Sequence, residues 1–375
     1  MTAGLRPLPE AGNGRVRWAA AERTTPGPPR SGRHRSLRLP VLRVVCWQLC
    51  LATVVVAVGS PWPARWGLLL GAATLLALSG SRVRGRWLSD ALVSVARFRL
   101  RRHDRDLDGL SPDECGRVLL RALVPGAGVH TVELAGRPAG VVSRGEELVA
   151  VTRPVGDDTA AFVRLVLSGS LPTDADPGPP RPGVRSQLVL HRGPQPGEVT
   201  RVWLTVRAMR DPNLATDAEL LVALNNTVRK LHRALREAGL GAVASTETQV
   251  LATLLALTHV GAGRGTVREE RRHWRAGHVS QVGLRVTGLA EHSPSARMQV
   301  LHHLLAAVPG SACTIAITVP GHSAVLRVAA MTDATVDAAV EWLVRLAPPG
   351  IRLERMDDEH APAVAASLPI GGGPR

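Results

Sequence analysis

Two apolar stretches near the start of the chain constrain its fold more than any other feature. Residues 39–59 form an apolar run whose only charged residue is Arg43, and residues 66–80 form a second, shorter run. The break between them contains two prolines, which end a helix and favour a tight reversal. About twenty apolar residues in a helix are long enough to cross a hydrocarbon layer of roughly 30 Å. The sequence therefore predicts a hairpin of two transmembrane helices, at about 39–59 and 64–80.

Two other interpretations of these runs stay open. A hairpin buried in a globular core is one, although the first run has no polar face to turn to water. A cleaved signal peptide is the other, although its apolar region would be shorter and no second run should follow. Within the hairpin, Trp62 and Trp66 suit a membrane–water boundary, and Gly67 and Gly71 are candidates for a close helix–helix contact.

Arginines on either side of the hairpin predict its orientation. The break between the two runs carries only Arg65. Four arginines precede the first run and three follow the second: Arg30, Arg33, Arg35, Arg38, Arg82, Arg84 and Arg86. Because positive residues favour the cytoplasmic side of a membrane, we expect a multi-pass protein with both termini in the cytoplasm.

The charge of the chain indicates an acidic partner or an anionic surface. The formal net charge is +15, and Lys230 is the one lysine among the 46 basic residues. Such a charge suits anionic lipids, and nucleic acid must also be considered. The excess of Arg, Ala and Gly is typical of a GC-rich coding sequence, which weakens charge as a functional signal. The four cysteines lack paired zinc-ligand spacing, so we expect free thiols.

Composition and periodicity divide the rest of the chain. Residues 1–38 predict a disordered basic tail on the inner leaflet or a solvated spacer. Residues 82–109 predict a basic amphipathic exit helix that contacts lipid or a partner, with a plain core helix as the alternative. Its contact candidates are Trp87, Arg97, Arg99, Arg101 and Arg102. Residues 110–375 predict a cytoplasmic α/β (α+β) domain with helices on a mixed sheet, possibly split near 171–197. We find no internal repeat in the sequence.

Within that domain, several local signals predict individual elements. The segment beginning Ser111-Pro112 is typical of a helix start. Three apolar runs separated by glycine-bearing breaks, residues 129–134, 138–142 and 147–152, predict an antiparallel meander. Residues 217–238 carry one apolar stripe at helical spacing and predict a long helix.

The motifs that suggest chemistry are weak. Residues 261–266 are glycine-rich but lack the lysine of a phosphate-binding loop, and residues 321–325 lack the closing glycine of a nucleophile elbow. Residues 357–360 (DDEH) are the densest group of metal-ligand types, but an acidic helix N-terminus is the simpler interpretation. We therefore expect no catalytic, metal-binding or cofactor-binding residues.

The arm at residues 264–275 (RGTVREERRHWR) mixes arginines with a tryptophan. Because Arg and Trp dominate interface hot spots, we expect a docking patch for an acidic partner. Its members are Arg271, Arg272, Trp274 and Arg275. A solvated loop of paired charges is the alternative, and the interleaved Glu269 and Glu270 weaken a nucleic-acid role, so no nucleic-acid partner is expected.

The order of these parts resembles EccE, the membrane component of the type VII (ESX) secretion system of actinobacteria. The resemblance rests on the tail, the two-helix anchor and the segments VARFRLRRHDRD, VTRVWLTVRAMRDPNLA, LVALNNTVRKLHRALREAGL, TETQVLATLLALTHV, REERRHWR and RLERMDDEHAPAVAASLPIGG. It covers nearly the whole chain, and residues 156–197 match least. It implies a non-enzymatic subunit of the bacterial inner (plasma) membrane, beside EccB-, EccC- and EccD-like partners, with ATP hydrolysis by another subunit.

These observations predict a structural membrane subunit that stabilises a type VII secretion complex without catalysis of its own. The alternative is a membrane-anchored transferase, because the family's cytoplasmic domain has been likened to glycosyltransferases in fold. A tether to anionic lipid or nucleic acid, based on charge alone, is a third possibility.

Overall fold

The computed structural model describes residues 41–83, 86–87, 98–99, 103–156, 158–169, 184–195, 197–210, 214, 216–261, 265–319 and 321–371. The chain divides into two compact units, Met1–Val83 and Arg84–Arg375, which we describe separately. The tail predicted over residues 1–38 lies outside the described residues.

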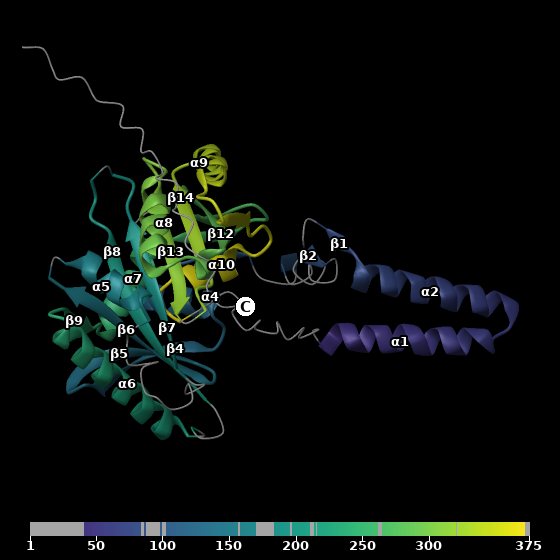
Figure 1. Ribbon diagram of the computed structural model, residues 1–375, viewed down its shortest axis with the longest axis horizontal. Coiled ribbons are helices and arrows are strands. Elements are labelled where there is room, and N and C mark those ends of the chain that lie inside the picture. The colour runs from purple at the N-terminus through teal and green to yellow at the C-terminus, as the bar shows by residue number, and fades with distance from the viewer. Residues whose placement is uncertain are drawn as a thin grey trace, which may run out of the picture. The chain divides into compact units, whose positions relative to one another are not determined.

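The first unit contains the helical hairpin that the apolar runs predict. Helix α1 (Val41–Val58) and helix α2 (Trp62–Gly80) pack along each other (Figure 1). Cys50 and Ala72 are buried between them, and the Cys50 thiol donates to the Ala72 carbonyl at 3.6 Å. Arg65 closes the reversal, because its guanidinium donates to the last carbonyls of α1, that of Val58 at 2.9 Å. These carbonyls have no partner within their own helix, so the arginine caps α1.

The described helices do not support the predicted membrane spans. Among the described residues, no helix is long and apolar enough to cross a membrane. Helix α1 has 18 residues, which at the rise of a helix gives about 27 Å, less than the roughly 30 Å of hydrocarbon. Helix α2 has 19 residues, but its first turn holds Pro63 and Arg65. The predicted transmembrane hairpin and the multi-pass inner-membrane location with both termini cytoplasmic are therefore wrong.

The region predicted as an exit helix lies mostly outside the described residues. Within residues 82–109, the structure describes the short strands β1 (Arg82–Val83), β2 (Arg86–Trp87) and β3 (Asp104–Asp106). Strand β3 pairs antiparallel with β10 (Thr266–Glu269), and Asp104 forms an ion pair with Arg268 at 3.3 Å. The end of this region is thus an edge strand where we predicted helix.

The second unit is built on one sheet of 13 described strands. Its order is β3-β10-β11-β12-β14-β13-β7-β8-β6-β5-β4, with β15 beside β12 and β9 beside β6. Every strand pair described in this sheet is antiparallel, so the predicted mixed sheet is wrong. The reason is the topology. The two parallel strands that each crossover helix connects are not neighbours in the sheet, because one other strand lies between them and runs antiparallel to both.

The first half of this sheet, residues 127–258, has a β-α-β-β-α-β centre with strand order β9-β6-β8-β7. A hairpin precedes this centre and a helix follows it. The elements are β4 (Ala127–Leu134), β5 (Arg137–Arg144), β6 (Glu147–Val155), α5 (Thr159–Leu167), β7 (Val184–Arg192), β8 (Arg201–Met209), α6 (Asp217–Glu237), β9 (Gly241–Ala244) and α7 (Glu247–Thr258). The predicted meander is confirmed by β4, β5 and β6, and the predicted long helix by α6.

The second half, residues 266–367, has the same topology, with strand order β15-β12-β14-β13 at its centre. The elements are β10, β11 (Trp274–Ala276), β12 (Val279–Thr287), the 3-10 turn η1 (Leu289–Glu291), α8 (Pro294–Ala306), β13 (Ala312–Val319), β14 (Ala324–Ala330), α9 (Asp333–Leu346), β15 (Arg352–Arg355) and α10 (His360–Ser367). Each half is therefore a hairpin, a ferredoxin-like unit and a closing helix, which the sequence did not reveal as a repeat.

The two halves join at the middle of the sheet, where β7 and β13 lie side by side (Figure 1). Alternate residues of these central strands enter different cores: Leu188 and Leu190 face α5, α6, α8 and α9, whereas Val189 faces the other side. That other side is covered by α7, α10 and α4 (Pro112–Leu123), which precedes the first half. The sheet is thus buried on both faces, as its nearly unbroken apolar strands require.

Local sequence fixes several helix starts. Ser111 and Glu114 form a capping box at the start of α4, which confirms the helix start predicted there. Thr216 with Glu219, and Thr246 with Gln249, do the same for α6 and α7. In each case a side-chain oxygen accepts from a backbone N–H that has no partner within the helix.

Candidate ligand pocket and its charged surroundings

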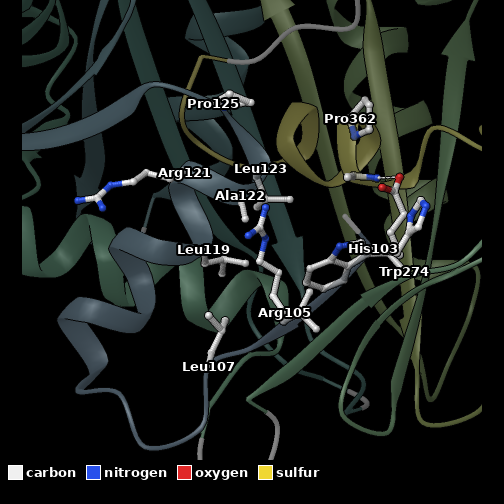
Figure 2. A pocket seen from close by; sticks show the side chains of 13 residues that line it. His103, Arg105, Leu107, Leu119, Arg121, Ala122, Leu123, Pro125, Trp274 and Pro362 are labelled. Carbon is white, nitrogen blue, oxygen red and sulfur yellow. Dashed lines mark hydrogen bonds between the residues drawn. The ribbon is translucent and has the colours of Figure 1, made fainter. Parts of the chain in front are cut away.

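A pocket of about 290 Å³ lies within the second unit, between α4, strands β3, β10 and β11, and the start of α10 (Figure 2). Its wall is mainly apolar, with side chains from residues 103–125, 267–274 and 361–362. The apolar side chains include Leu107, Leu119, Leu123, Val267, Trp274 and Pro362. Apolar, concave sites with a few polar groups are the usual places where proteins bind small molecules.

Trp274 is part of this wall, although the sequence placed it on an exposed docking patch. The side chain is only 2% exposed, and its ring lies beside the pocket in Figure 2. It begins β11 and pairs across the sheet with Glu269 and Gln281. Its position on the inner face of the edge hairpin turns the indole toward α4 and α10, so it is unavailable as a surface anchor.

Arg105, on β3, is the charged group that enters the pocket. Figure 2 shows its guanidinium beside Ala122 and Leu123, whereas Arg121 points away on the outer side of α4. Arg105 is half-buried, and within the described part of the chain it has no hydrogen bond or ion pair. A half-buried cation without a partner favours an anion beside it.

Glu269 and His103 are further polar groups of the pocket wall. Glu269 is 6% exposed, and its Oε1 accepts from the Ala361 backbone N–H at 2.8 Å, at the start of α10. A carboxylate there satisfies a free N–H and the positive end of the helix dipole. The His103 ring packs on Phe98 with centroids 4.3 Å apart, and its buried Nδ1 has no partner among the described residues.

The predicted docking arginines lie next to the pocket and are all ion-paired. Arg271 pairs with Asp358 at 3.4 Å and Arg272 with Asp337 at 3.6 Å. Arg275 pairs with Asp333 and, at 3.4 Å, with Glu270. This geometry matches the charge-paired loop that the sequence left open as an alternative to a docking patch.

These ion pairs connect the β10–β11 arm to α9 and β15. Burial opposes ionisation of Asp333, but the hydrogen bond from Ser280 and the charges of His273 and Arg275 outweigh it, so its pKa is lowered. Burial likewise opposes ionisation of Asp337, and hydrogen bonds from Arg355 and His273 lower its pKa overall. Both carboxylates on α9 are therefore ionised and form ion pairs.

Glu270, His273 and Asp333 bring three ligand atoms within 4.8 Å of one another, which is close enough to hold a metal ion. However, Arg275 pairs with both acids, and His273 Nε2 lies 3.1 Å from Asp337. A divalent cation would have to displace a guanidinium that already neutralises its ligands. The arrangement fits an ion-pair connection between elements better than an open metal site.

Residues 357–360 form the helix start that the sequence predicts. Helix α10 begins at His360, and the two acidic residues before its cap pair with Arg355 at 2.8 Å and Arg271 at 3.4 Å. His360 is fully buried, and burial, with the charges of Arg355 and His273, lowers its pKa to about 3. The imidazole is therefore neutral in the folded protein.

A buried polar network at the centre of the sheet escaped the sequence analysis. Arg327 on β14 is 1% exposed; its guanidinium donates to Gln281 and, at 3.5 Å, to Thr314. Thr314 also contacts His191 at 2.9 Å. Burial lowers the pKa of Arg327 to about 9, and burial with the nearby charges of Arg327 and Arg201 lowers that of His191 to about 4. A single charge inside the strand AVLRVAA was the available signal.

The remaining predicted contact residues lie in the α1–α2 hairpin, between residues 86 and 99, or outside the described residues. Trp62 and Trp66 form an edge-to-face pair, 5.7 Å between centroids, and are 69% and 56% exposed. A Cβ added at Gly67 or Gly71 would meet no described atom within 4 Å. Trp87 lies in β2 and Arg99 is exposed, whereas Arg97, Arg101 and Arg102 lie outside the described residues.

A comparison of this chain with known protein-family models found no match, and neither did a comparison with curated proteins.

Proposed function

We propose that the chain is a non-catalytic structural subunit of a type VII protein secretion complex. The observation that carries this proposal is the apolar surface of the α1–α2 hairpin. Large apolar side chains on both helices face outward, with Leu51, Val58 and Leu70 each about 70% exposed (68%, 71% and 71%). Extended exposed apolar surfaces mark interaction sites, because removing apolar surface from water lowers the free energy.

The partner of this surface is a set of apolar helices from neighbouring subunits, the EccB-, EccC- and EccD-like proteins. The outward face presents Trp, Leu and Val, and Arg65 is engaged with α1 carbonyls. Gly67 and Gly71 lie on α2 with open space beside them, so another helix can approach closely there.

The ion-pair network of the second unit supports a structural role. The acids Asp333, Asp337 and Asp358 pair with arginines from the β10–β11 arm, so their charge joins elements that are far apart in sequence. Such groups position and fasten an arm; they do not present a free acid or base to a substrate.

The test is purification of the tagged chain from its host in mild detergent, followed by mass spectrometry. We expect an FtsK-like ATPase and a many-spanning EccD-like protein to be recovered with it. Recovery of the chain alone, or with envelope-biosynthesis enzymes, would refute the proposal.

Glycine variants locate the contact. Gly71→Ile and Gly67→Ile fill open space without touching a described atom of this chain, so the hairpin should still form. We expect each to reduce recovery of the partner subunits at least fivefold. Gly80→Ile is the matched control, since a Cβ at this end of α2 also meets nothing within 4 Å. Equal recovery with all three variants would exclude the glycine face as the contact.

A further inference from the structure

We propose that the pocket between α4, β3 and α10 binds a compact apolar anion, a molecule of about ten to twelve carbon atoms with one carboxylate. This site lies within the second unit, and the proposal does not depend on membership of a secretion complex.

The size of the pocket sets the size of the ligand. A cavity of about 150 Å³ lined by apolar side chains accommodates benzene. This pocket measures about 290 Å³, roughly twice as much, so a two-ring body or a short aliphatic chain fits. A flat aromatic body suits it best, because Trp274 presents its ring system beside the pocket (Figure 2).

The apolar wall explains why the ligand has one polar end only. Leu119 and Val267 are buried at 1% and 5% exposure, and they line the pocket together with Trp274 and Pro362. A ligand with polar groups along its body would lose hydrogen bonds to water against this wall without replacing them. The polar group must therefore lie at the end near Arg105.

Arg105 determines the sign of the ligand's charge. Its guanidinium enters the pocket, is half-buried, and has no acidic partner in the described part of the chain. The acid of the pocket wall, Glu269, is bound to the Ala361 N–H at the start of α10. A carboxylate matches the fork of a guanidinium with two parallel hydrogen bonds, which a neutral amide cannot do.

The experiment is calorimetric titration of the full chain with naphthoate, compared with its neutral isostere naphthamide. We expect saturable binding of naphthoate with one site per chain, at least tenfold tighter than that of naphthamide. Arg105→Gln should weaken naphthoate at least tenfold and leave naphthamide within twofold, which also shows that the variant is folded.

Arg121→Gln is the matched control, because this arginine borders the same pocket but points away from it. It should leave naphthoate binding within twofold. Ala122→Phe, which places a ring where the guanidinium of Arg105 lies, should abolish binding of both ligands. Equal losses with Arg105→Gln and Arg121→Gln, equal affinity for the two ligands, or unchanged binding to Ala122→Phe would each overturn the proposal.

Discussion

The two halves of the sheet share a topology but stabilise it differently, most clearly where their closing helices begin. In the first half, α7 begins with Glu247, whose carboxylate binds Arg117 of α4 at 2.7 Å and Thr131 of β4 at 2.8 Å. In the second half, α10 begins with the buried, neutral His360 and depends on the buried Glu269 of β10. The first half thus uses a partly exposed ion pair and the second uses buried polar groups.

The centre of the sheet shows the same difference. In the first half, Gln187 and Thr205 face each other across β7 and β8. In the second half the corresponding pair across β13 and β14 is Thr314 and Arg327, so a neutral hydroxyl is replaced by a buried guanidinium. The comparison teaches that one backbone arrangement tolerates both solutions, and that the second half holds more charge away from water. That half therefore depends more on hydrogen bonds and charges that are shielded from water.

The largest expected effect comes from the glycines at which the closing helices approach the sheet. A Cβ at Gly283 would lie 2.3 Å from the Ala363 Cβ of α10, and a Cβ at Gly140 would lie 2.6 Å from the Glu247 backbone of α7. We expect Gly283→Val and Gly140→Val each to lower the free energy of unfolding by about 3 kcal/mol, measured by urea denaturation.

A compensating variant separates crowding from other effects. Gly283→Ala should be partly rescued by Ala363→Gly, which removes the methyl group that it meets, despite the helix cost of about 1 kcal/mol. For Gly140 no such rescue is available, because the contact is backbone. Wild-type stability for Gly283→Val would show that α10 does not approach the sheet at this glycine.

Counted per residue, acidification should have the next largest effect on stability. His191 and His360 have folded-state pKa values near 4 and 3, below the ordinary value of 6.5, so the unfolded chain binds protons that the folded chain does not. Stability is therefore complete above about pH 6.5 and falls as the pH drops toward those values. At pH 5 we expect a loss of about 2 kcal/mol per histidine.

Urea denaturation at pH 7.5 and pH 5 measures this loss. His360→Gln should reduce the difference between the two pH values by about half, since the contribution of His191 remains. The same pH dependence in wild type and variant would show that α10 begins without a buried neutral imidazole.

The helix starts offer a smaller, paired test. Glu269→Gln removes a buried charged acceptor from the α10 N-terminus and should cost about 1.5 kcal/mol, whereas Glu247→Gln at α7 should cost about 0.5 kcal/mol. Hydrogen exchange of the Ala361 amide should accelerate only in the first variant. A larger loss for Glu247→Gln would reverse our comparison of the two halves.

The smallest effect is expected for the exposed arm. The Arg271 side chain is 76% exposed and pairs with Asp358 at 3.4 Å. Because exposed ion pairs contribute little, Arg271→Gln should change the free energy of unfolding by less than about 0.5 kcal/mol in chemical denaturation. A loss above 1 kcal/mol would mean that the arm is essential to the second half.

The sequence by itself determined the elements that depend on neighbouring residues. The prolines at the break predicted the reversal between α1 and α2, the Ser111 cap predicted the start of α4, and the alternating runs predicted the β4–β6 meander. Each of these follows from contacts within a few residues, so the local pattern is sufficient. The predicted first helix also included Gly59, which is a turn residue just beyond the end of α1.

The tertiary structure alone decided how those elements pair and what they bury. The two similar halves join through β7 and β13, whose paired residues are more than a hundred positions apart. The burial of Trp274 and of Arg327 also depends on residues that are distant in the sequence. The pocket combines α4, β3, β10, β11 and α10, and Arg105 faces it only because β3 pairs with β10. Strand pairing is chosen by total burial over the whole sheet, which no short stretch of sequence contains.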